Sequence, residues 1–357
     1  MKVAILGPAI EHRDSLKSML QGRVRQLEWI SDSHGFLGGR APTWRDRVNR
    51  ALDQLSRTRN PEYLAHLVQQ VDALQPDVVI AYWGTNPLPD VAALRRLRPR
   101  VKLVLMVLCY PQALTDAGVF RQHWMMRRAA KHLDGLMFPN QEMADYFSST
   151  VLPGKMPAFA VIPPCWPASF QSDVQAAPAS DRANLIFIGR TDLSHHTVHV
   201  ADDLRPLMRS VVEAGIELHH RQSTETDDGH PLRKPFQPMG QSELIRKVSG
   251  HDACLIAYNT AACARDERFR FTVPDRLITT VAAGVPIAIP SEGYEGSKSY
   301  LENYPAVIEF ESPQALARQL ADRPKMAVLR AAAWQARERY CAEAQGPLLQ
   351  TFLESFG

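Results

Sequence analysis

The chain has 357 residues, of which 45% are hydrophobic and 22% charged, ordinary proportions for a soluble globular protein that exclude a collagen, a coiled coil and a long disordered chain. At about 150 residues per domain, this length predicts two domains. The net charge of +3 is too small to indicate a dedicated nucleic-acid binder. The charge is uneven, since residues 1–183 carry +6 and the remainder −3, so we expect the N-terminal half to meet an anionic partner.

The cysteine pattern and the hydrophobic runs indicate the cellular compartment of the protein and its relation to membranes. There are five cysteines, an odd number without a C-x-x-C pair, so neither a disulfide framework nor a zinc site is predicted and a reducing cytoplasm fits best. The apolar run at the start ends at Gly7-Pro8, too short for a signal peptide. Because no window approaches the roughly 20 apolar residues that span a bilayer, any membrane contact is expected to be peripheral.

The first half of the chain alternates short buried strands with helices, the pattern of a parallel sheet covered on both faces. The strands are predicted over residues 3–6, 27–30, 78–82, 103–108, 136–138 and 159–162. Helices are predicted over 61–74 and 90–97. Residues 1–170 therefore form one predicted doubly wound domain.

A small, polar stretch, residues 171–183, is predicted to be a linker, after which the strand-helix alternation resumes. The second series has predicted strands over 184–188, 216–220, 253–258, 286–290 and 307–310, and predicted helices over 202–214, 242–249, 275–283 and 313–320. Residues 324–352 are helical by composition. The sequence thus predicts a second α/β domain over residues 184–339.

Residues that follow parallel strands are where ligands bind in such sheets. Neither Gly7 nor Gly189 opens a G-x-G-x-x-G loop, and there is no P-loop, so an NAD enzyme and a P-loop NTPase are disfavoured. Gly189-Arg190 would let the backbone approach a ligand and offer a guanidinium fork suited to phosphate. Arg276 stands in the first turn of the predicted helix 275–283, whose N-terminus would also favour phosphate.

The segment PDRLITTVAAGVPIAIP, residues 274–290, resembles the P-x-[KR]-L…A-A-G-x-P-[VI] motif of bacterial GT-B glycosyltransferases that use nucleotide sugars. Ile188-Gly189-Arg190 and the segment 249–258 are similar to other parts of that pattern. The resemblance implies two Rossmann-like doubly wound domains facing across a cleft, with the nucleotide sugar on the C-terminal domain and the acceptor on the N-terminal one. It also implies a final helix, about residues 340–357, that returns to the first domain.

The sequence departs from this family at three positions. The glutamate that binds the ribose in many retaining members is replaced by Thr279, followed by Thr280, and the usual lysine after the glycine-arginine turn by His195-His196. The histidine or aspartate after the fourth strand is absent. The donor is therefore expected to contact Gly189, Arg190, His195, Tyr258, Asn259, Arg276, Thr279 and Thr280.

Acidic and histidine side chains after N-domain strands are the candidates for a catalytic base, which would take a proton from the acceptor hydroxyl. They are Asp32, His34 and Asp116. The segment His195-His196-x-x-His199 lacks the spacing of a zinc site, so no metal is predicted. Basic clusters at residues 95–102 and 127–131, the second beside Trp124, fit either a solvated helix face or an anionic membrane surface.

We therefore predict a cytoplasmic, metal-independent hexosyltransferase of polysaccharide biosynthesis, in contact with the inner membrane face, that needs no resident cofactor. The nucleotide-diphosphate sugar, a UDP-sugar by preference, is its substrate, and a glycan, lipid-linked glycan or protein is the acceptor; no nucleic acid is a partner. A sugar-nucleotide epimerase of the same fold and a catalytically silent binding subunit are the alternatives.

Overall fold

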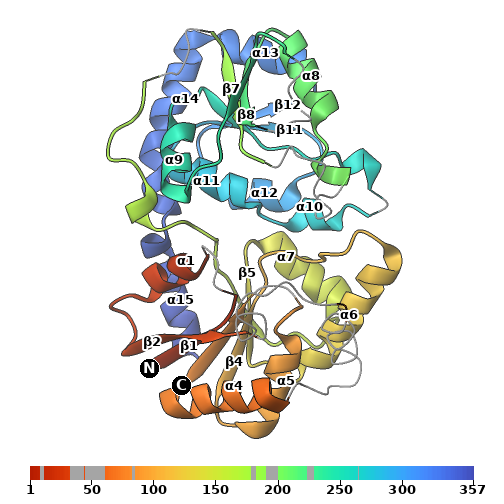
Figure 1. Ribbon diagram of the computed structural model, residues 1–357, viewed down its shortest axis with the longest axis vertical. Coiled ribbons are helices and arrows are strands. Elements are labelled where there is room, and N and C mark those ends of the chain that lie inside the picture. The colour runs from red at the N-terminus through yellow and green to blue at the C-terminus, as the bar shows by residue number, and fades with distance from the viewer. Residues whose placement is uncertain are drawn as a thin grey trace. The chain divides into compact units, whose positions relative to one another are not determined.

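Figure 1 shows the computed structural model of the chain. The structure describes residues 1–8, 12–32, 44, 61–82, 85–177, 182–189, 200–222, 229–263 and 265–357. These residues form two compact units. Unit 1 consists of Met1–Pro164 together with Gln345–Gly357, and unit 2 consists of Cys165–Ala344.

Unit 1 is built on a parallel sheet of six strands in the order β2-β1-β3-β4-β5-β6. The strands are β1 (Lys2–Gly7), β2 (Gln26–Ser31), β3 (Val78–Tyr82), β4 (Lys102–Met106), β5 (Gly135–Phe138) and β6 (Ala158–Val161). The central strands β3 and β4 read VVIAY and KLVLM and are almost entirely buried. Such continuous apolar runs are expected where helices cover both faces of a parallel sheet.

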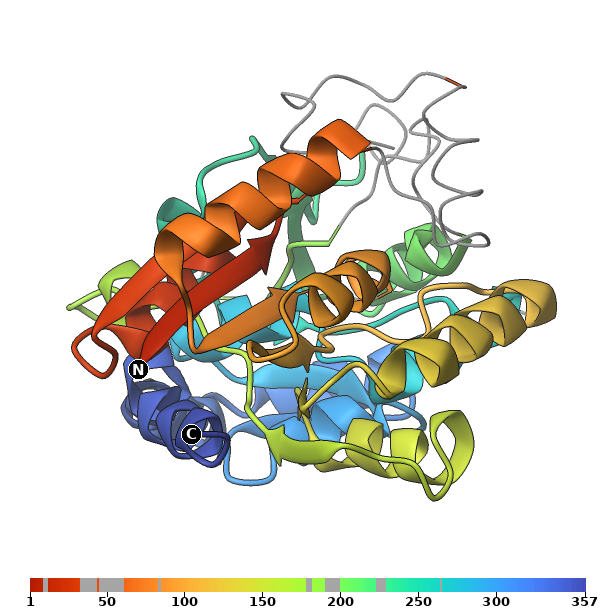
Figure 2. The ribbon, with the colours of Figure 1, turned by 90° about the horizontal axis from the view of Figure 1, so that it is seen from below.

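The helices of unit 1 connect these strands and pack on the sheet. They are α1 (His12–Leu20), α4 (Pro61–Leu74), α5 (Leu88–Leu97), α6 (Asp116–Ala130), α7 (Gln141–Tyr146) with its π-helical extension Phe147–Val151, and α15 (Ala342–Glu354). Figure 2 shows α4 lying along β1 and β2. α15 begins in the last residues of unit 2 and continues into unit 1. There the chain end packs on β5, because a Cβ at Gly135 would lie 2.8 Å from the Phe352 ring.

Unit 2 also has six parallel strands, in the order β12-β11-β10-β7-β8-β9. The strands are β7 (Asn184–Phe187), β8 (Glu217–Arg221), β9 (Arg233–Phe236), β10 (Ala253–Leu255), β11 (Ile287–Pro290) and β12 (Val307–Phe310). The helices are α8 (Arg205–Glu213), α9 (Gln241–Ser249), α10 (Glu267–Phe271), α11 (Asp275–Ala283), α12 (Glu295–Tyr300), α13 (Pro313–Ala321) and α14 (Arg323–Ala336). Short 3₁₀ turns lie at Ala168–Phe170, Val200–Asp202, Thr260–Ala262 and Arg337–Tyr340.

Side chains of the unit 2 strands alternate between two hydrophobic cores, one on each face of the sheet. Ile186 and Cys254 belong to the core formed with α9 and α11. Leu185 and Leu255 belong to the core formed with α8 and α13. This period of two places one helix layer on each face. The prediction of two doubly wound α/β domains is therefore confirmed.

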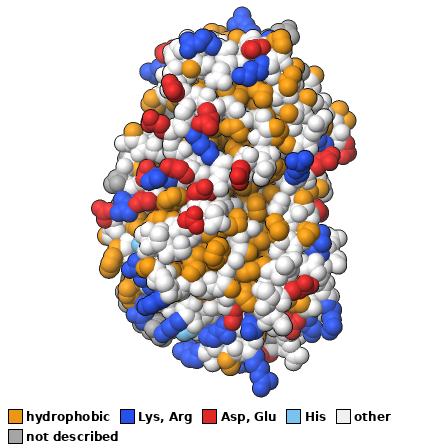
Figure 3. All heavy atoms as spheres, turned by 180° about the vertical axis from the view of Figure 1, so that it is seen from behind, with side chains coloured by type: hydrophobic (Ala, Val, Ile, Leu, Met, Phe, Trp, Pro, Cys, Tyr) orange, Lys and Arg blue, Asp and Glu red, His pale blue; other side chains and the backbone are white. Residues whose placement is uncertain are grey.

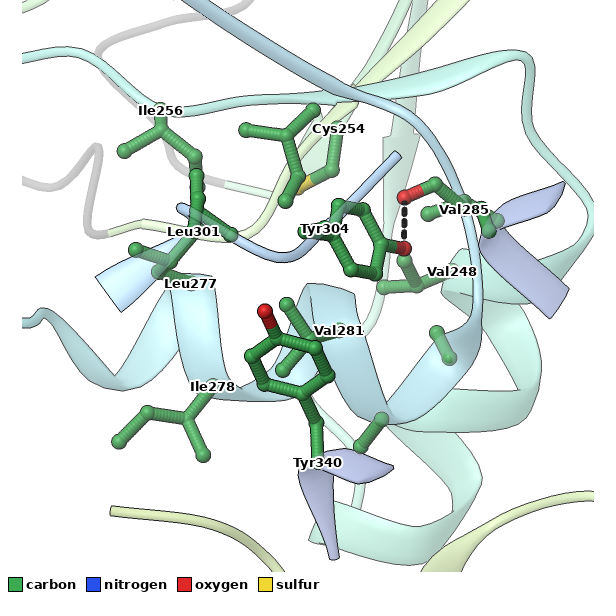
Figure 4. Packing of buried hydrophobic residues seen from close by; sticks show 14 of the residues in the cluster. Val248, Cys254, Ile256, Leu277, Ile278, Val281, Val285, Leu301, Tyr304 and Tyr340 are labelled. Atoms are coloured by element: carbon green, nitrogen blue, oxygen red, sulfur yellow. Dashed lines mark hydrogen bonds between the residues drawn. The ribbon is translucent and has the colours of Figure 1, made fainter. Parts of the chain in front are cut away.

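Figure 4 shows the first of these cores, where Tyr304 and Tyr340 pack among aliphatic side chains of α11 and near Cys254 of β10. The Tyr304 hydroxyl donates a hydrogen bond to the Val285 carbonyl at 2.8 Å, which satisfies a polar group that burial would otherwise penalise. Between α11 and β11, Gly284 adopts a left-handed conformation with φ 63°. A Cβ there would lie 2.9 Å from the Trp334 Cα, so this position of the motif requires glycine.

Most predicted strands agree with the structure to within two residues; the segment 253–258 is the exception, because its strand ends at Leu255. β9 was not predicted; it reads RKPF and buries only Arg233 and Phe236. An edge strand with two cations and a proline lacks the apolar run that identifies a strand. Residues 171–177 of the predicted linker lie on unit 2, where the Gln175 Nε2 donates to the Arg330 carbonyl at 3.2 Å.

Charged side chains of both signs cover the face shown in Figure 3, with hydrophobic side chains exposed between them. In the described part of the chain, no helix is long and apolar enough to cross a membrane.

Candidate functional site

The strand orders define one topological switch point in each sheet, where the chain leaves in opposite directions from two neighbouring strands. In unit 2 it lies between β7 and β10, and in unit 1 between β1 and β3. Ligands of open α/β sheets bind beyond the carboxyl ends of the strands at such points. Gly189 follows β7, and Tyr258 and Asn259 follow β10, so three predicted site residues stand at the unit 2 switch point.

Gly189 and Arg276 lie against each other at this strand end. A Cβ on Gly189 would come within 2.6 Å of the Arg276 Nη1, and it would also collide with the ring of Phe187. Any side chain at position 189 would therefore displace the guanidinium. The glycine allows an arginine from α11 to lie across the end of β7.

The Arg276 guanidinium is held by aromatic rings and has unused hydrogen-bonding capacity. Its Cζ lies 3.8 Å from the centroid of the Tyr258 ring and 5.5 Å from that of Phe187. Its Nε and Nη2 atoms are buried, and no described residue accepts a hydrogen bond from either. Buried donors without a partner are rare because they lose their hydration. This pair of donors is therefore the strongest indication of an anion site.

The start of α11 adds to the electrostatics of this site. Arg276 is the second residue of α11, and the cap residue is Pro274, whose side chain accepts no hydrogen bond from the first turn. The N-terminal end of a helix carries a partial positive charge and directs N–H groups outward. A cation and a helix N-terminus thus stand together at the unit 2 switch point, an arrangement that suits a phosphate.

Tyr258 is held in place by two other aromatic residues. Its backbone N–H donates to the Tyr294 hydroxyl at 2.7 Å, and its ring centroid lies 4.5 Å from that of Phe269. Burial raises the pKa of Tyr294, although its hydrogen bond to Tyr258 and the charge of Arg276 oppose this effect. Tyr294 is therefore neutral and serves as a fixed hydrogen-bonding group. Asn259 is half-buried, and its N–H donates to the Ala201 carbonyl at 2.7 Å.

Thr279 and Thr280 have contacts that differ from those expected of ligand-binding hydroxyls. Thr279 is 2% exposed, and its Oγ1 accepts hydrogen bonds from the Trp166 Nε1 at 3.0 Å and the Gln241 Nε2 at 2.7 Å. Thr280 is fully buried and donates to the Arg276 carbonyl at 2.6 Å. Both hydroxyls are engaged inside unit 2, where they stabilise α11.

The candidate bases of unit 1 follow different strands. Asp32 is half-buried after β2, and Asp116 is exposed as the first residue of α6, on the connection after β4. Because β1 and β3 separate these strands, their ends lie roughly 14 Å apart at about 4.8 Å per strand. The two carboxylates therefore belong to different strand ends of the sheet. His34, Arg190 and His195 lie outside the described residues.

The sequence analysis missed several aromatic residues at the two switch points. In unit 1, the Tyr82 hydroxyl donates to the Pro8 carbonyl, and a Cβ on Gly7 would collide with the Tyr82 ring. In unit 2, Phe187 and Tyr294 contact Arg276 and Tyr258. Their positions relative to the strands could have identified two of them as site residues, because Tyr82 ends β3 and Tyr294 follows β11 by four residues.

Among the described side chains, no group of three or more histidines, cysteines or acids is arranged to hold a metal ion. His219 and His251 are close, with ring centroids 4.4 Å apart. His219 instead pairs with Glu217 at 2.8 Å, and burial lowers the pKa of His251 to about 3. These histidines are therefore part of the neutral interior of unit 2.

Comparison with known proteins identifies the fold. No protein-family model matches the sequence, and no curated protein matches it either. Solved structures do match over nearly the whole chain. A sucrose-phosphate synthase from Thermosynechococcus elongatus matches with a TM-score of 0.64 and 11% identity, over 99% of this chain and 98% of that one.

Two further structures agree with this result. HepE from Anabaena in complex with UDP-glucose matches with a TM-score of 0.63 and 13% identity, over 99% of this chain and 100% of that one. A glycosyltransferase from Rickettsia africae matches with a TM-score of 0.65 and 10% identity, over 99% and 98%. The chain therefore has the GT-B fold, as the motif at residues 274–290 predicts.

Proposed function

We propose that the protein is a glycosyltransferase that moves a sugar from a nucleoside-diphosphate sugar to an acceptor hydroxyl. The observation that carries this proposal is the pair of buried, unpartnered Arg276 nitrogens at the unit 2 switch point. A diphosphate supplies the oxygens that these donors lack, and a planar guanidinium binds such oxygens in a fork geometry.

We place the diphosphate against the Arg276 guanidinium and the N-terminal end of α11, close to the backbone at Gly189. Tyr258 and Asn259 border the nucleoside or the sugar, while Thr279 and Thr280 hold α11 in position. We propose a UDP-sugar as donor, and the similarity to HepE, whose structure contains UDP-glucose, supports this choice. The nucleotide sugar is the substrate, so the protein needs no resident cofactor.

Transfer requires that the bond between the sugar carbon and the diphosphate breaks as the acceptor oxygen attacks. Arg276 and the α11 N–H groups stabilise the negative charge that develops on the departing diphosphate, the task that a metal ion performs in other enzymes. We assign the acceptor to unit 1, whose switch point presents Gly7, Pro8 and Tyr82. Asp32 or Asp116 takes the acceptor proton.

The acceptor is proposed to be a glycan, a lipid-linked glycan or a protein, with an anionic acceptor favoured. The positive charge of residues 1–183 supports this preference, because unlike charges increase the rate and strength of association. We further propose a role in polysaccharide biosynthesis on the cytoplasmic side of a membrane, which suits such an acceptor.

The test is a screen of UDP-sugars and GDP-sugars for release of the free nucleotide, with and without glycan acceptors. We expect a UDP-sugar to release UDP, and Arg276→Ala to reduce this release while Arg318→Ala, an exposed site on α13, leaves it unchanged. Conversion of the sugar nucleotide without release of UDP would indicate an epimerase instead. Binding of UDP without any turnover would indicate a binding subunit.

A further inference from the structure

A groove lies between α5 and α6 of unit 1, and its lining does not include the switch-point residues Gly7, Pro8 and Tyr82. Its volume is about 230 Å³. The apolar part of its lining includes Leu88, Ala93 and Met125, which are buried, and Trp124, which is half-buried. Arg96 lines it from α5 and Arg128 from α6. The α5–α6 groove thus combines an apolar floor with cations from both of its helices.

The outer face of α6 continues this surface with aromatic residues. Phe120, Trp124 and Arg128 are spaced four residues apart, so they form one stripe along the helix. Phe120 is 71% exposed, and the Arg128 Cζ lies 4.4 Å from the Trp124 ring centroid. A large exposed ring is costly in water. Such a stripe suits an environment that is apolar on one side and anionic on the other.

The arginines of these helices divide into two groups. Arg95 forms an ion pair with Asp134, and the Arg127 Nε donates to the Val151 carbonyl at 2.8 Å, so both stabilise unit 1. Arg96 and Arg128 are exposed, and neither forms an ion pair with an acid in the described chain. These two cations are therefore available to an external anion.

The acidic side chains of α5 and α6 lie away from Arg96 and Arg128. Asp90, the acid of α5, is 2% exposed. Asp116, the acid of α6, lies at the far end of the helix, twelve residues before Arg128 and therefore roughly 18 Å away. Arg121 of α6 and Lys131, the residue that follows α6, are exposed and add positive charge. The surface is therefore basic around Arg96 and Arg128, and its charge becomes less positive toward Asp116, which lies one helical turn before Phe120.

We propose that the α5–α6 groove, with Phe120 and Trp124 beside it, docks on the surface of an anionic lipid bilayer. Arg96 and Arg128 contact the headgroup phosphates, while Phe120 and Trp124 enter the interface between headgroups and acyl chains. Charge complementarity supports a lipid phosphate, and the exposed ring of Phe120 favours a bilayer over a nucleic acid, whose backbone offers no apolar layer. This inference does not depend on the proposed enzymatic activity.

The test is sedimentation of the full chain with vesicles of phosphatidylcholine, with or without phosphatidylglycerol. We expect binding only when phosphatidylglycerol is present. Each cation near an anionic surface contributes about a fivefold factor, so Arg96→Ala with Arg128→Ala is expected to weaken binding about 30-fold. Phe120→Ser is expected to weaken it further without changing the charge.

Matched controls come from exposed residues of α13 and α14. Arg318→Ala with Lys325→Ala removes the same charge from unit 2, and Val328→Ser removes an aliphatic side chain that is 69% exposed. Both control variants are expected to bind the vesicles as strongly as the native chain does. Three results would each overturn the proposal. The native chain could bind equally well with and without phosphatidylglycerol, or the Arg96 and Arg128 double variant could bind like the native chain. The Arg318 and Lys325 double variant could also lose as much binding as the Arg96 and Arg128 variant.

Discussion

Replacement of Arg276 by alanine is expected to weaken nucleotide binding without weakening the fold. The two buried nitrogens of Arg276 have no acceptor among the described residues, and each such donor costs about 1 to 3 kcal/mol. The cation–π contact of Arg276 with the Tyr258 ring, at 3.8 Å, stabilises the folded state by about 0.5 to 2 kcal/mol. The free energy of unfolding should therefore increase or fall by no more than about 1 kcal/mol, so any decrease in Tm should be at most about 2 to 4 °C.

The same substitution removes the hydrogen bonds that a diphosphate would accept. A hydrogen bond to a charged group contributes about 1.5 to 3 kcal/mol, so the affinity for UDP should fall roughly 10-fold to 150-fold. Calorimetric titration of UDP and thermal unfolding without ligand measure the two effects on one preparation. Arg276→Lys keeps the charge but loses the forked geometry of the guanidinium, so its affinity for UDP should lie between those of the native protein and Arg276→Ala. A large loss of stability with unchanged affinity would refute the reasoning, because Arg276 would then be a structural residue.

Three further substitutions or conditions test other parts of the structure. Gly189→Ala should displace the Arg276 guanidinium, since its Cβ would lie 2.6 Å from Nη1, and UDP titration should show weaker binding; native affinity would contradict the close approach. Gly284→Ala should destabilise unit 2 by about 1 to 3 kcal/mol in urea unfolding, because φ is 63° and Trp334 is near; an unchanged midpoint would mean that the turn adapts freely. Burial lowers the pKa of His251 to about 3 from 6.5, so the unfolded state binds more protons and stability should fall as pH drops below about 6.5, by about 2 kcal/mol at pH 5. His251→Phe should lose less stability over this range, and an identical loss would assign the effect to other groups.

The sequence predicts those parts of the fold that depend on local patterns. β3 and β11 were recognisable because strands buried on both faces are continuous apolar runs. The position of Arg276 also followed from a local pattern, the first turn of a helix that begins after a proline. β9 was missed because an edge strand with charged residues has no such run.

The roles of individual side chains at the site depend on tertiary contacts instead. Thr279 was expected to face a ligand, but its hydroxyl is used by Trp166 and Gln241, which are 113 and 38 residues away in the sequence. Tyr294 was missed because its hydrogen bond joins it to Tyr258, 36 residues away in the sequence, and because it adopts a left-handed backbone with φ 65°. A linear pattern contains neither piece of information.

The most direct test of the central claim is a crystal structure of the protein with UDP. We expect the diphosphate at the unit 2 switch point, with its oxygens about 2.7 to 2.9 Å from the Arg276 Nε and Nη2 atoms. We also expect the uridine or ribose beside Tyr258 and Asn259. A diphosphate bound elsewhere, or an Arg276 that remains without a phosphate partner at saturating UDP, would contradict the account.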